Sequence, residues 1–557
     1  MRSRDRVGVR HDRVRLRLGL LAALLALCAS TTPALGAVAV PVPVPVPAPE
    51  PDAAASRTEP LPETGVASAG PRAFQPVEAS IATVHAAFRS GQLQVTELVR
   101  FYLDRIARHD DGSAGLNSIA ALSNRVLEEA GELDRRLAQD GVPAAQPLFG
   151  IPLIVKDNIE TGHLPVTAGS ALLEGFTPGT EATLVRRLRA AGALVLGTAN
   201  MHEFAYGIES VGSVFGAVRN PYDRDRHPGG SSGGTAAAVS ASLALAGIGT
   251  DTCGSVRNPA GHTALVGVRG TQGLVSRAGI VPLSLTQDIA GPLARSVADA
   301  ARILSVVTGF DAADPQTARS VGHHVTDYHA ALGQATLAGK RFGVVRQLVA
   351  VEPADAEIAR VFEQAVADLR AAGAVVIDIE PLPLAELVYA VAGGFYVLSR
   401  DFARDIDGYL TQRPQAPVRS LVEIVADGRA HPAVQPLLLG SLTQRSDAPG
   451  LYLAELAKRQ RLRDALLFEL TNSQLDALIY PNIRQPASPL GTTQGGSNCH
   501  LSANSGLPAL TVPMGYTAGG LPAGLELLGA AWSEAKLLAL AHAYEQRTRH
   551  RRPPPLR

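Results

Sequence analysis

A helix followed directly by a strand recurs along this chain, and this order constrains the fold more than any other feature. The segment EATLVRRLRAAGALVLG (Glu181–Gly197) predicts a helix that ends near Gly192 and then a strand over Ala193–Leu196. The same order returns later, where a helix predicted over Asp355–Ala372 precedes the apolar run AVVIDI. Strands that alternate with helices are typical of an α/β layered domain.

Other segments extend this pattern. The run LFGIPLIV (Leu148–Val155) predicts a buried strand, and Ser80–Phe88 and Thr96–Ile106 carry apolar residues at helical spacing. The stretch Ala313–Arg461 is rich in helical signals but less regularly patterned. We therefore expect it to form a helix-rich insertion beside the core.

The first residues of the chain are typical of an export signal. A basic segment precedes the apolar run Leu18–Ala29, which is too short to span a membrane, and small residues allow cleavage after Gly36. We predict a signal peptide over residues 1–36, no stable membrane span, and a periplasmic or secreted protein. Lipoprotein anchoring at Cys28 is the less favoured alternative, because the bulky Leu27 precedes that cysteine.

A proline-rich segment follows the predicted signal peptide. In PVPVPVPAPEPD (Pro41–Asp52), alternating prolines fix φ and remove backbone donors, which gives an extended spacer that does not pack. We predict a disordered linker over residues 37–75, which leaves residues 76–557 for the folded domain.

Composition and charge exclude several classes of protein. The 557 residues include 51 Lys and Arg and 51 Asp and Glu, so neither nucleic acid nor an anionic membrane is expected as a partner. Hydrophobic residues make up 46% and charged residues 18% of the chain, which is ordinary for a globular protein. Only four of the basic residues are lysines: Lys156, Lys340, Lys458 and Lys536.

The cysteines are too few for a disulfide framework or a metal motif. Without Cys28, which falls in the predicted signal peptide, Cys253 and Cys499 remain, with no CxxC or His-rich spacing near either. We predict no metal site. Free buried thiols are the favoured state of both cysteines, and a single bridge between them stays open as the alternative.

The segment Gly229–Gly261 (GGSSGGTAAAVSASLALAGIGTDTCGSVRNPAG) concentrates serines among glycines. Gly230, Ser232 and Gly234 match G-x-S-x-G, the nucleophile elbow of α/β-hydrolases. That elbow requires a strand directly before it and a triad histidine, whereas the loop-like NPYDRDRHPGG precedes it here. A Ser-His-Asp triad is therefore disfavoured, and a nucleophile in this segment needs a different base.

Lys156 is the candidate base, because it ends an apolar strand where burial lowers the pKa of an amine. Its surroundings resemble the amidase signature family over about Ser80–Gln546. The segments that carry the resemblance are GIPLIVKDNI, PGGSSGGTAAAV, GTDTCGSVRNPA, GLVSRAGIVPLSLTQDIAGPLARSVADA and LTVPMGY. GLVSRAGIVPLS and WSEAKLLALAHAYEQ are most similar to the peptide-amidase-like branch. The resemblance implies a mixed β-sheet core flanked by helices, with residues 76–557 as the catalytic domain.

The resemblance also implies a Ser–cis-Ser–Lys triad. The family's intervals are kept, since 75 residues separate Lys156 from Ser231 and 24 separate Ser231 from Ser255. Ser255 would attack an amide carbonyl, and Ser231, after a cis peptide bond, would pass the proton to neutral Lys156.

Residues next to the nucleophile receive supporting roles from the same resemblance. The oxyanion hole would be formed by the backbone N–H groups of Thr252, Cys253 and Gly254, together with the N–H of the nucleophile itself. Asp251 and Arg257 flank this loop and are expected to brace it. Two residues depart from many relatives: Cys253 replaces Gly or Asp, and Arg269 replaces Lys in a position expected to be structural.

These residues favour an extracytoplasmic amidase that hydrolyses a carboxylic amide, such as a peptide C-terminal amide, to the acid and ammonia through a Ser255 acyl-enzyme. Its expected partner is a small-molecule or peptide amide substrate, and no cofactor is expected. One alternative is a glutamine-hydrolysing amidotransferase subunit, which works in the cytosol with partner subunits. Another is a non-catalytic binding protein on the same scaffold. The predicted export signal argues against the first and the complete triad against the second, while the substrate and the oligomeric state stay open.

Overall fold

The computed structural model describes residues 74–112, 114–383, 394–446 and 449–556. The predicted signal peptide (residues 1–36) and nearly all of the predicted linker (37–75) lie outside these residues, so both remain predictions. In the part of the chain that is described, no helix combines the length and apolar character needed to cross a membrane.

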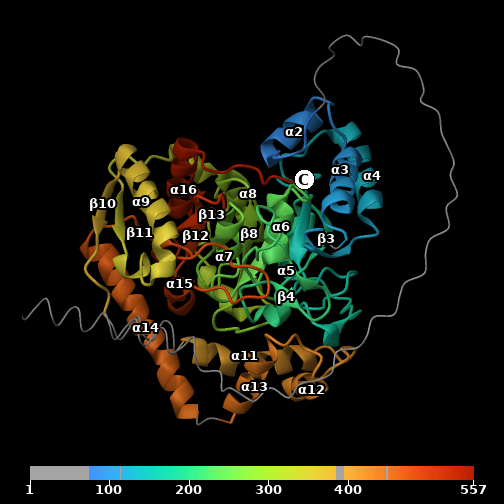
Figure 1. The fold of residues 1–557 in the computed structure, drawn as a ribbon. Helices are drawn as coiled ribbons and strands as arrows, with labels where there is room; N and C mark the ends of the chain where they lie inside the picture. The colour runs from blue at the N-terminus through green and yellow to red at the C-terminus, as the bar shows by residue number, and fades with distance from the viewer. Residues whose placement is uncertain (1–73, 113, 384–393, 447–448, 557) are drawn as a thin grey trace, which may run out of the picture. The chain divides into compact units, whose positions relative to one another are not determined.

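One mixed sheet runs through the described residues, with 11 strands in the order β1-β3-β2-β6-β8-β7-β12-β13-β11-β9-β10 (Figure 1). Strand β2 pairs in parallel with β3 and β6, and β9 pairs in parallel with β10 and β11, while the remaining neighbours are antiparallel. The expected mixed sheet is therefore confirmed. The strands are β1 (Ile119–Leu122), β2 (Pro152–Lys156), β3 (Leu194–Ala199), β6 (Ala246–Asp251), β7 (Val266–Arg269), β8 (Ile289–Ala294), β9 (Arg341–Val344), β10 (Val375–Asp378), β11 (Ala477–Pro481), β12 (Ala509–Tyr516) and β13 (Pro522–Leu528), with a separate pair β4 (Val211–Gly212) and β5 (Gly216–Ala217).

Helices flank this sheet, and those predicted at 80–88, 96–106 and 355–372 correspond to α2, α3 and α9. The first turn of α2 is capped, because the Ser80 side chain accepts a hydrogen bond from the N–H of Thr83. The α-helices are α2 (Ile81–Arg89), α3 (Val95–His109), α4 (Val126–Asp140), α5 (Thr183–Ala190), α6 (Gly233–Ser240), α7 (Arg257–His262), α8 (Val297–Val307), α9 (Ala356–Ala371), α11 (Gly394–Thr411), α12 (Leu421–Asp427), α13 (Gln435–Gln444), α14 (Pro449–Asn472), α15 (His500–Ser505) and α16 (Glu534–Thr548).

The stretch predicted as a helix-rich insertion, residues 313–461, divides into two parts. Its first part supplies β9, α9 and β10, which complete one edge of the main sheet. Its second part supplies α11, α12 and α13, which gather below the sheet in Figure 1. These helices share a hydrophobic cluster with the segment between β2 and β4, with members that include Leu173, Phe176, Phe204, Phe402, Ile406 and Leu421.

The glycine- and serine-rich segment contains helix α6, and its residues Gly229–Ser232 lead directly into that helix. Every residue of α6 is buried, and the helix contacts the central strands of the sheet. Small side chains are required there, since a Cβ added to Gly234 would lie 2.1 Å from the carbonyl oxygen of Asn200. The close packing of α6 fixes the serines that directly precede it.

The close approach of the central strands β7 and β8 can be tested at a glycine. A Cβ at Gly291 of β8 would lie 1.9 Å from the carbonyl oxygen of Val268 in β7. We therefore expect Gly291→Ala to lower the free energy of unfolding by about 3 kcal/mol, measured by urea denaturation. The control is Gly131→Ala in α4, where no atom lies within 4 Å and a gain of about 0.5–1 kcal/mol is expected. Equal midpoints for Gly291→Ala and the wild type would contradict this close approach.

Candidate active site

The candidate base lies where two parallel strands end side by side. Lys156 is the last residue of β2, and the neighbouring strand β6 ends at Asp251. Lys156 Nζ consequently lies 2.8 Å from Thr250 Oγ1. Burial lowers the pKa of the Lys156 amine to about 7, against the opposing attraction of Asp288 and Asp251. Near neutral pH, a large fraction of the amine is therefore unprotonated, as a base requires.

Ser231 lies in direct contact with this amine. Its Oγ is 2.7 Å from Lys156 Nζ, and the peptide bond between Gly230 and Ser231 is cis, as the family resemblance implied. The Ser231 carbonyl accepts a hydrogen bond from the N–H of His202 at 3.1 Å. Gly229 has a φ of 82°, and a Cβ there would lie 2.9 Å from Pro259 Cα, so this turn requires glycine.

Ser255 lies in the turn between β6 and α7, and this turn is bonded to the segment that carries Ser231. The N–H of Ser232 donates to the carbonyl of Ser255 at 3.2 Å. The side chain of Ser255 is buried, as are those of Lys156 and Ser231. The structure thus brings the three predicted triad residues into one region, and their catalytic roles stay predictions.

Ser232, the serine of the elbow-like motif, is held by the backbone of β6. Its Oγ donates to the carbonyl of Thr250 at 3.2 Å and accepts from the N–H of Thr250 at 3.3 Å. The residues before Gly230 form turns and extended coil instead of the strand that a nucleophile elbow requires. This geometry supports a structural role for the Ser232 hydroxyl.

A buried charge network supports the turn that carries Ser255. The Asp251 carboxylate accepts hydrogen bonds from the N–H groups of Gly254 at 2.7 Å and Val256 at 3.2 Å. It also binds Arg257 Nε at 3.0 Å and Arg269 Nη1 at 2.9 Å. Burial raises the pKa of Asp251, but the two arginines outweigh burial and hold this pKa well below its usual value. Asp251 and Arg257 lie where bracing residues were predicted, and Arg269 joins the same network.

The network continues into the strands that follow much later in the chain. Arg257 Nη1 also binds Glu526 of β13, whose Oε1 accepts a hydrogen bond from Tyr480 Oη of β11 at 3.0 Å. Burial raises the pKa of Glu526 to about 7, while Arg257 lowers it. Glu526 and Tyr480 were not predicted as support residues. Their only signal in the sequence is a polar group inside the apolar strands GLELLG and ALIYP.

One of the predicted oxyanion-hole donors is already engaged. The N–H of Gly254 points to Asp251, so it does not face a carbonyl bound in front of Ser255. Thr252 and Cys253 stay predicted donors, and the turn at Thr252 is held by a hydrogen bond from its hydroxyl to Asp288 at 2.6 Å.

Cys253 and Cys499 form a disulfide, so the favoured prediction of free thiols is wrong and the alternative is confirmed. The two cysteines are 246 residues apart in the chain. Their approach depends on the end of β6 meeting the start of α15, which no local pattern in the sequence reveals.

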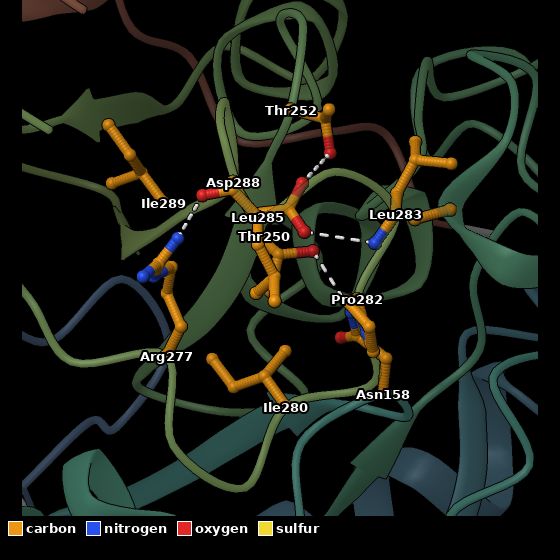
Figure 2. Close-up of a pocket in the computed structure, with 11 residues that line it drawn as sticks. Asn158, Thr250, Thr252, Arg277, Ile280, Pro282, Leu283, Leu285, Asp288 and Ile289 are labelled. Atoms are coloured by element: carbon orange, nitrogen blue, oxygen red, sulfur yellow. Dashed lines mark hydrogen bonds between the residues drawn. The ribbon is translucent and has the colours of Figure 1, made fainter. Parts of the chain in front are cut away.

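Asp288, another residue without a predicted role, faces a small cavity that is also lined by Thr250, the residue whose hydroxyl contacts Lys156 Nζ (Figure 2). Its carboxylate accepts hydrogen bonds from the Thr252 hydroxyl and from the N–H of Leu283, the latter at 2.9 Å. Burial raises the pKa of Asp288 to about 6. When ionised, Asp288 attracts the Lys156 ammonium and raises the pKa of that amine. The polar residues that line the cavity are Asn158, Thr250, Thr252, Arg277 and Asp288.

The proposed base is tested by removing its ability to lose a proton. In the wild type, the rate at which a fluorophosphonate labels Ser255 should rise as the pH passes about 7, because Lys156 becomes neutral there. Lys156→Arg should slow labelling by about 100-fold or more, since a guanidinium keeps its proton. The matched control is Lys536→Arg at an exposed position, which should label normally. Normal labelling of Lys156→Arg would show that another group is the base.

The influence of Asp288 is tested by the same labelling reaction. Removing its negative charge removes an attraction that favours the ammonium form of Lys156, so the pKa of the amine should fall further. We expect Asp288→Asn to move the midpoint of the pH dependence to a lower pH than in the wild type. Asp355→Asn serves as the control, because Asp355 is also buried but is paired with Arg484. An unchanged or higher midpoint in Asp288→Asn would contradict this role.

Comparison with known proteins places this geometry in a family. The family model described as Amidase matches residues 97–538. The solved structure of peptide amidase from Stenotrophomonas maltophilia superposes with a TM-score of 0.80 and 40% identity, covering 86% of this chain and 99% of that chain. A glutamyl-tRNA(Gln) amidotransferase subunit of Thermotoga maritima superposes with a TM-score of 0.69 and 27% identity, covering 87% of this chain and 98% of that chain.

Similar sequences carry amidotransferase names. A glutamyl-tRNA(Gln) amidotransferase subunit of Symbiobacterium thermophilum is 35% identical over 490 residues, which cover 85% of this chain and 97% of that protein. The corresponding subunit of Halorhodospira halophila is 36% identical over 488 residues, covering 84% of this chain and 97% of that protein.

These relatives correct the functional expectation. An extracytoplasmic amidase was favoured over an amidotransferase-type subunit, and that preference was wrong, since the two similar sequences and the Thermotoga maritima structure named above are amidotransferase subunits. The preference rested on the predicted export signal, which precedes the region that the family model matches. The chain belongs to the Amidase family, and it is an enzyme that acts on carbon–nitrogen bonds by amide hydrolysis or amidotransfer.

Proposed function

We propose that this chain is an amidase of the glutamyl-tRNA(Gln) amidotransferase type, which hydrolyses the side-chain amide of glutamine at Ser255 and supplies ammonia to a partner subunit. Relatives named as subunits of that amidotransferase support the proposal, because they align over 97% of their own length. The observation that carries the chemistry is the 2.7 Å contact between Lys156 Nζ and Ser231 Oγ.

The first half of the proposed reaction forms an acyl-enzyme. Ser255 Oγ attacks the amide carbonyl, its proton passes to Ser231, and the proton of Ser231 passes to the neutral amine of Lys156. The negative charge that develops on the carbonyl oxygen is stabilised by backbone N–H groups at Thr252 and Cys253. The Lys156 ammonium then returns a proton to the departing nitrogen, and ammonia leaves.

The second half restores the enzyme. Water attacks the ester formed at Ser255 and gives up a proton along the same route through Ser231 to Lys156. The ester carbon–oxygen bond breaks, Ser255 regains its proton, and glutamate leaves as the acid. Each step uses only side chains and backbone groups of this chain together with water, so none requires a cofactor.

The proposed macromolecular partner is a protein. The names of the relatives contain the word subunit, which indicates that those proteins assemble with others. This chain has equal numbers of basic and acidic residues, 51 of each, which gives no bulk attraction for nucleic acid. We therefore propose that any tRNA is bound by the partner.

The location of the protein is a separate question from its chemistry. The predicted export signal lies outside the described residues, so a periplasmic or secreted location stays a prediction, and it conflicts with the amidotransferase-type proposal, because such a subunit works in the cytosol. The Cys253–Cys499 disulfide is relevant here, because such bonds persist most readily in oxidising compartments.

The function is tested by measuring ammonia release from glutamine by the purified full-length chain. We expect turnover in the wild type and a loss of about 1000-fold or more in Ser255→Ala, because the acyl-enzyme cannot form. Ser232→Ala is the matched control. Its hydroxyl is bonded to β6, so we expect this variant to lose less than about tenfold in kcat.

Two further substrates distinguish the amidotransferase-type proposal from an amidase that acts on other amides. A peptide C-terminal amide and an aryl amide are assayed beside glutamine with the same preparations. Turnover of either amide with no release from glutamine would overturn the amidotransferase-type proposal, provided that a fluorophosphonate still labels Ser255.

A further inference from the structure

The turn that carries Ser255 is held from two sides. On one side, the Asp251 carboxylate accepts hydrogen bonds from the N–H groups of Gly254 and Val256. On the other side, the disulfide joins Cys253 to Cys499, whose Cα atoms are 5.1 Å apart. Within the described residues, this disulfide is the covalent link between the turn and the C-terminal part of the fold.

Cys499 also shapes the turn through direct packing. It lies immediately before α15, and its carbonyl accepts a hydrogen bond from Arg257 Nη2 at 3.3 Å. A Cβ added to Gly254 would lie 2.8 Å from Cys499 Cβ, so Cys499 packs on the backbone of the turn. The segment between Thr252 and Gly254, which contains the predicted oxyanion donors, is thus fitted against Cys499.

We propose that the Cys253–Cys499 disulfide is a redox-modifiable site that sets the reactivity of Ser255. A dithiol opens the bond, the turn loses its link to α15, and the serine reacts more slowly until the bond re-forms. The site is placed for this effect, because Cys253 lies two residues before Ser255 in the same turn.

A small reductant can reach this disulfide from one side. Cys253 and His500 are partly exposed, whereas Cys499 is 4% exposed. Attack on Cys253 Sγ is therefore the accessible route. His500 Nδ1 lies 3.5 Å from Cys253 Sγ, where its imidazole can exchange a proton with the sulfur.

The proposed exchange is balanced by two electrons from a dithiol. One thiolate of the dithiol attacks Cys253 Sγ, the S–S bond breaks, and Cys499 leaves as a thiolate that takes a proton. The second thiolate of the dithiol then attacks the dithiol-derived sulfur of the mixed disulfide. This step closes the cyclic disulfide and expels the Cys253 thiolate, which also takes a proton. The products are two protein thiols and a cyclic disulfide.

Opening the bond leaves the noncovalent contacts of the turn in place. The bonds from Gly254 and Val256 to Asp251 and from Thr252 to Asp288 remain, so the turn does not unfold. It gains freedom at Cys253, and the predicted oxyanion donors are aligned less closely. Losing a whole donor costs about 100–1000-fold in rate, so we expect a smaller loss of about tenfold in the rate of Ser255 labelling.

The test uses full-length protein that carries Cys28→Ser, so that thiol titration counts only the pair. Native protein is treated with dithiothreitol in the presence of EDTA, because ligand atoms of Cys253, Cys499 and His500 lie within 4.8 Å of one another and the freed thiols could capture a metal. We expect two new thiols per chain, about tenfold slower fluorophosphonate labelling of Ser255, and recovery on reoxidation. Labelling needs no natural substrate, so its outcome is separate from the outcome of the glutamine assay.

The matched variant is Cys499→Ser, which removes the bond and leaves Cys253 in the turn. It should label at the rate of the reduced protein and should not respond to dithiothreitol, with folding checked by thermal unfolding. Resistance of the native disulfide to dithiothreitol would overturn the proposal. The appearance of two new thiols with an unchanged rate of Ser255 labelling would also overturn the proposal, because the bond would then be purely structural. This second outcome is measured on protein that keeps both Cys253 and Cys499, so it does not depend on the folding of Cys499→Ser.

Discussion

Withdrawing the amine of Lys156 from water is what gives it the chemistry of a base, because a buried ammonium loses hydration that its neighbours replace only in part. The burial follows from the sheet. Strands β2 and β6 are parallel neighbours, so their ends meet, and Lys156 is enclosed between Thr250 and the serine segment that leads into α6. Asp288 and Asp251 stabilise the ammonium form of Lys156, while burial destabilises that form. The balance holds the pKa of the amine near neutrality.

The same sheet brings buried side chains of opposite charge into contact. Asp251 and Glu526 are buried carboxylates, and Arg257 binds both. Removing one partner of such a pair leaves a buried charge without compensation, which typically costs about 3–5 kcal/mol. Electrostatic contacts therefore help to hold the turn that carries Ser255, because its backbone N–H groups bind a carboxylate that also pairs with two arginines.

The outline of the fold and the central residues of the site could be predicted from the sequence, because both leave local signals. Helix and strand periodicity located α9, β3 and β10, and the apolar run before Lys156 located β2. The spacing of Lys156, Ser231 and Ser255 resembled that of a known family, and the structure brings these residues into one region.

Partners that meet only through the sheet could not be predicted. The local sequence around Cys253 and Cys499 does not indicate that they pair, because no spacing motif near either cysteine includes the other. Asp288 and Glu526 are single acidic residues in apolar strands or loops, and their roles come from neighbours brought by tertiary packing. The choice between a free amidase and an amidotransferase-type subunit failed for another reason: it rested on residues 1–36, which carry no information about the reaction.

The buried network has a consequence for how the protein is made. Lys156, Ser231 and Ser255 are synthesised in the first half of the chain, while Cys499 and Glu526, which hold the turn of the nucleophile, come near its end. Domains acquire their structure as the chain leaves the ribosome, so a nascent chain carries its reactive groups long before it carries the residues that align them. The ribosome-bound polypeptide therefore lacks the residues that align its reactive groups, and we expect chains that end before Cys499 to be inactive.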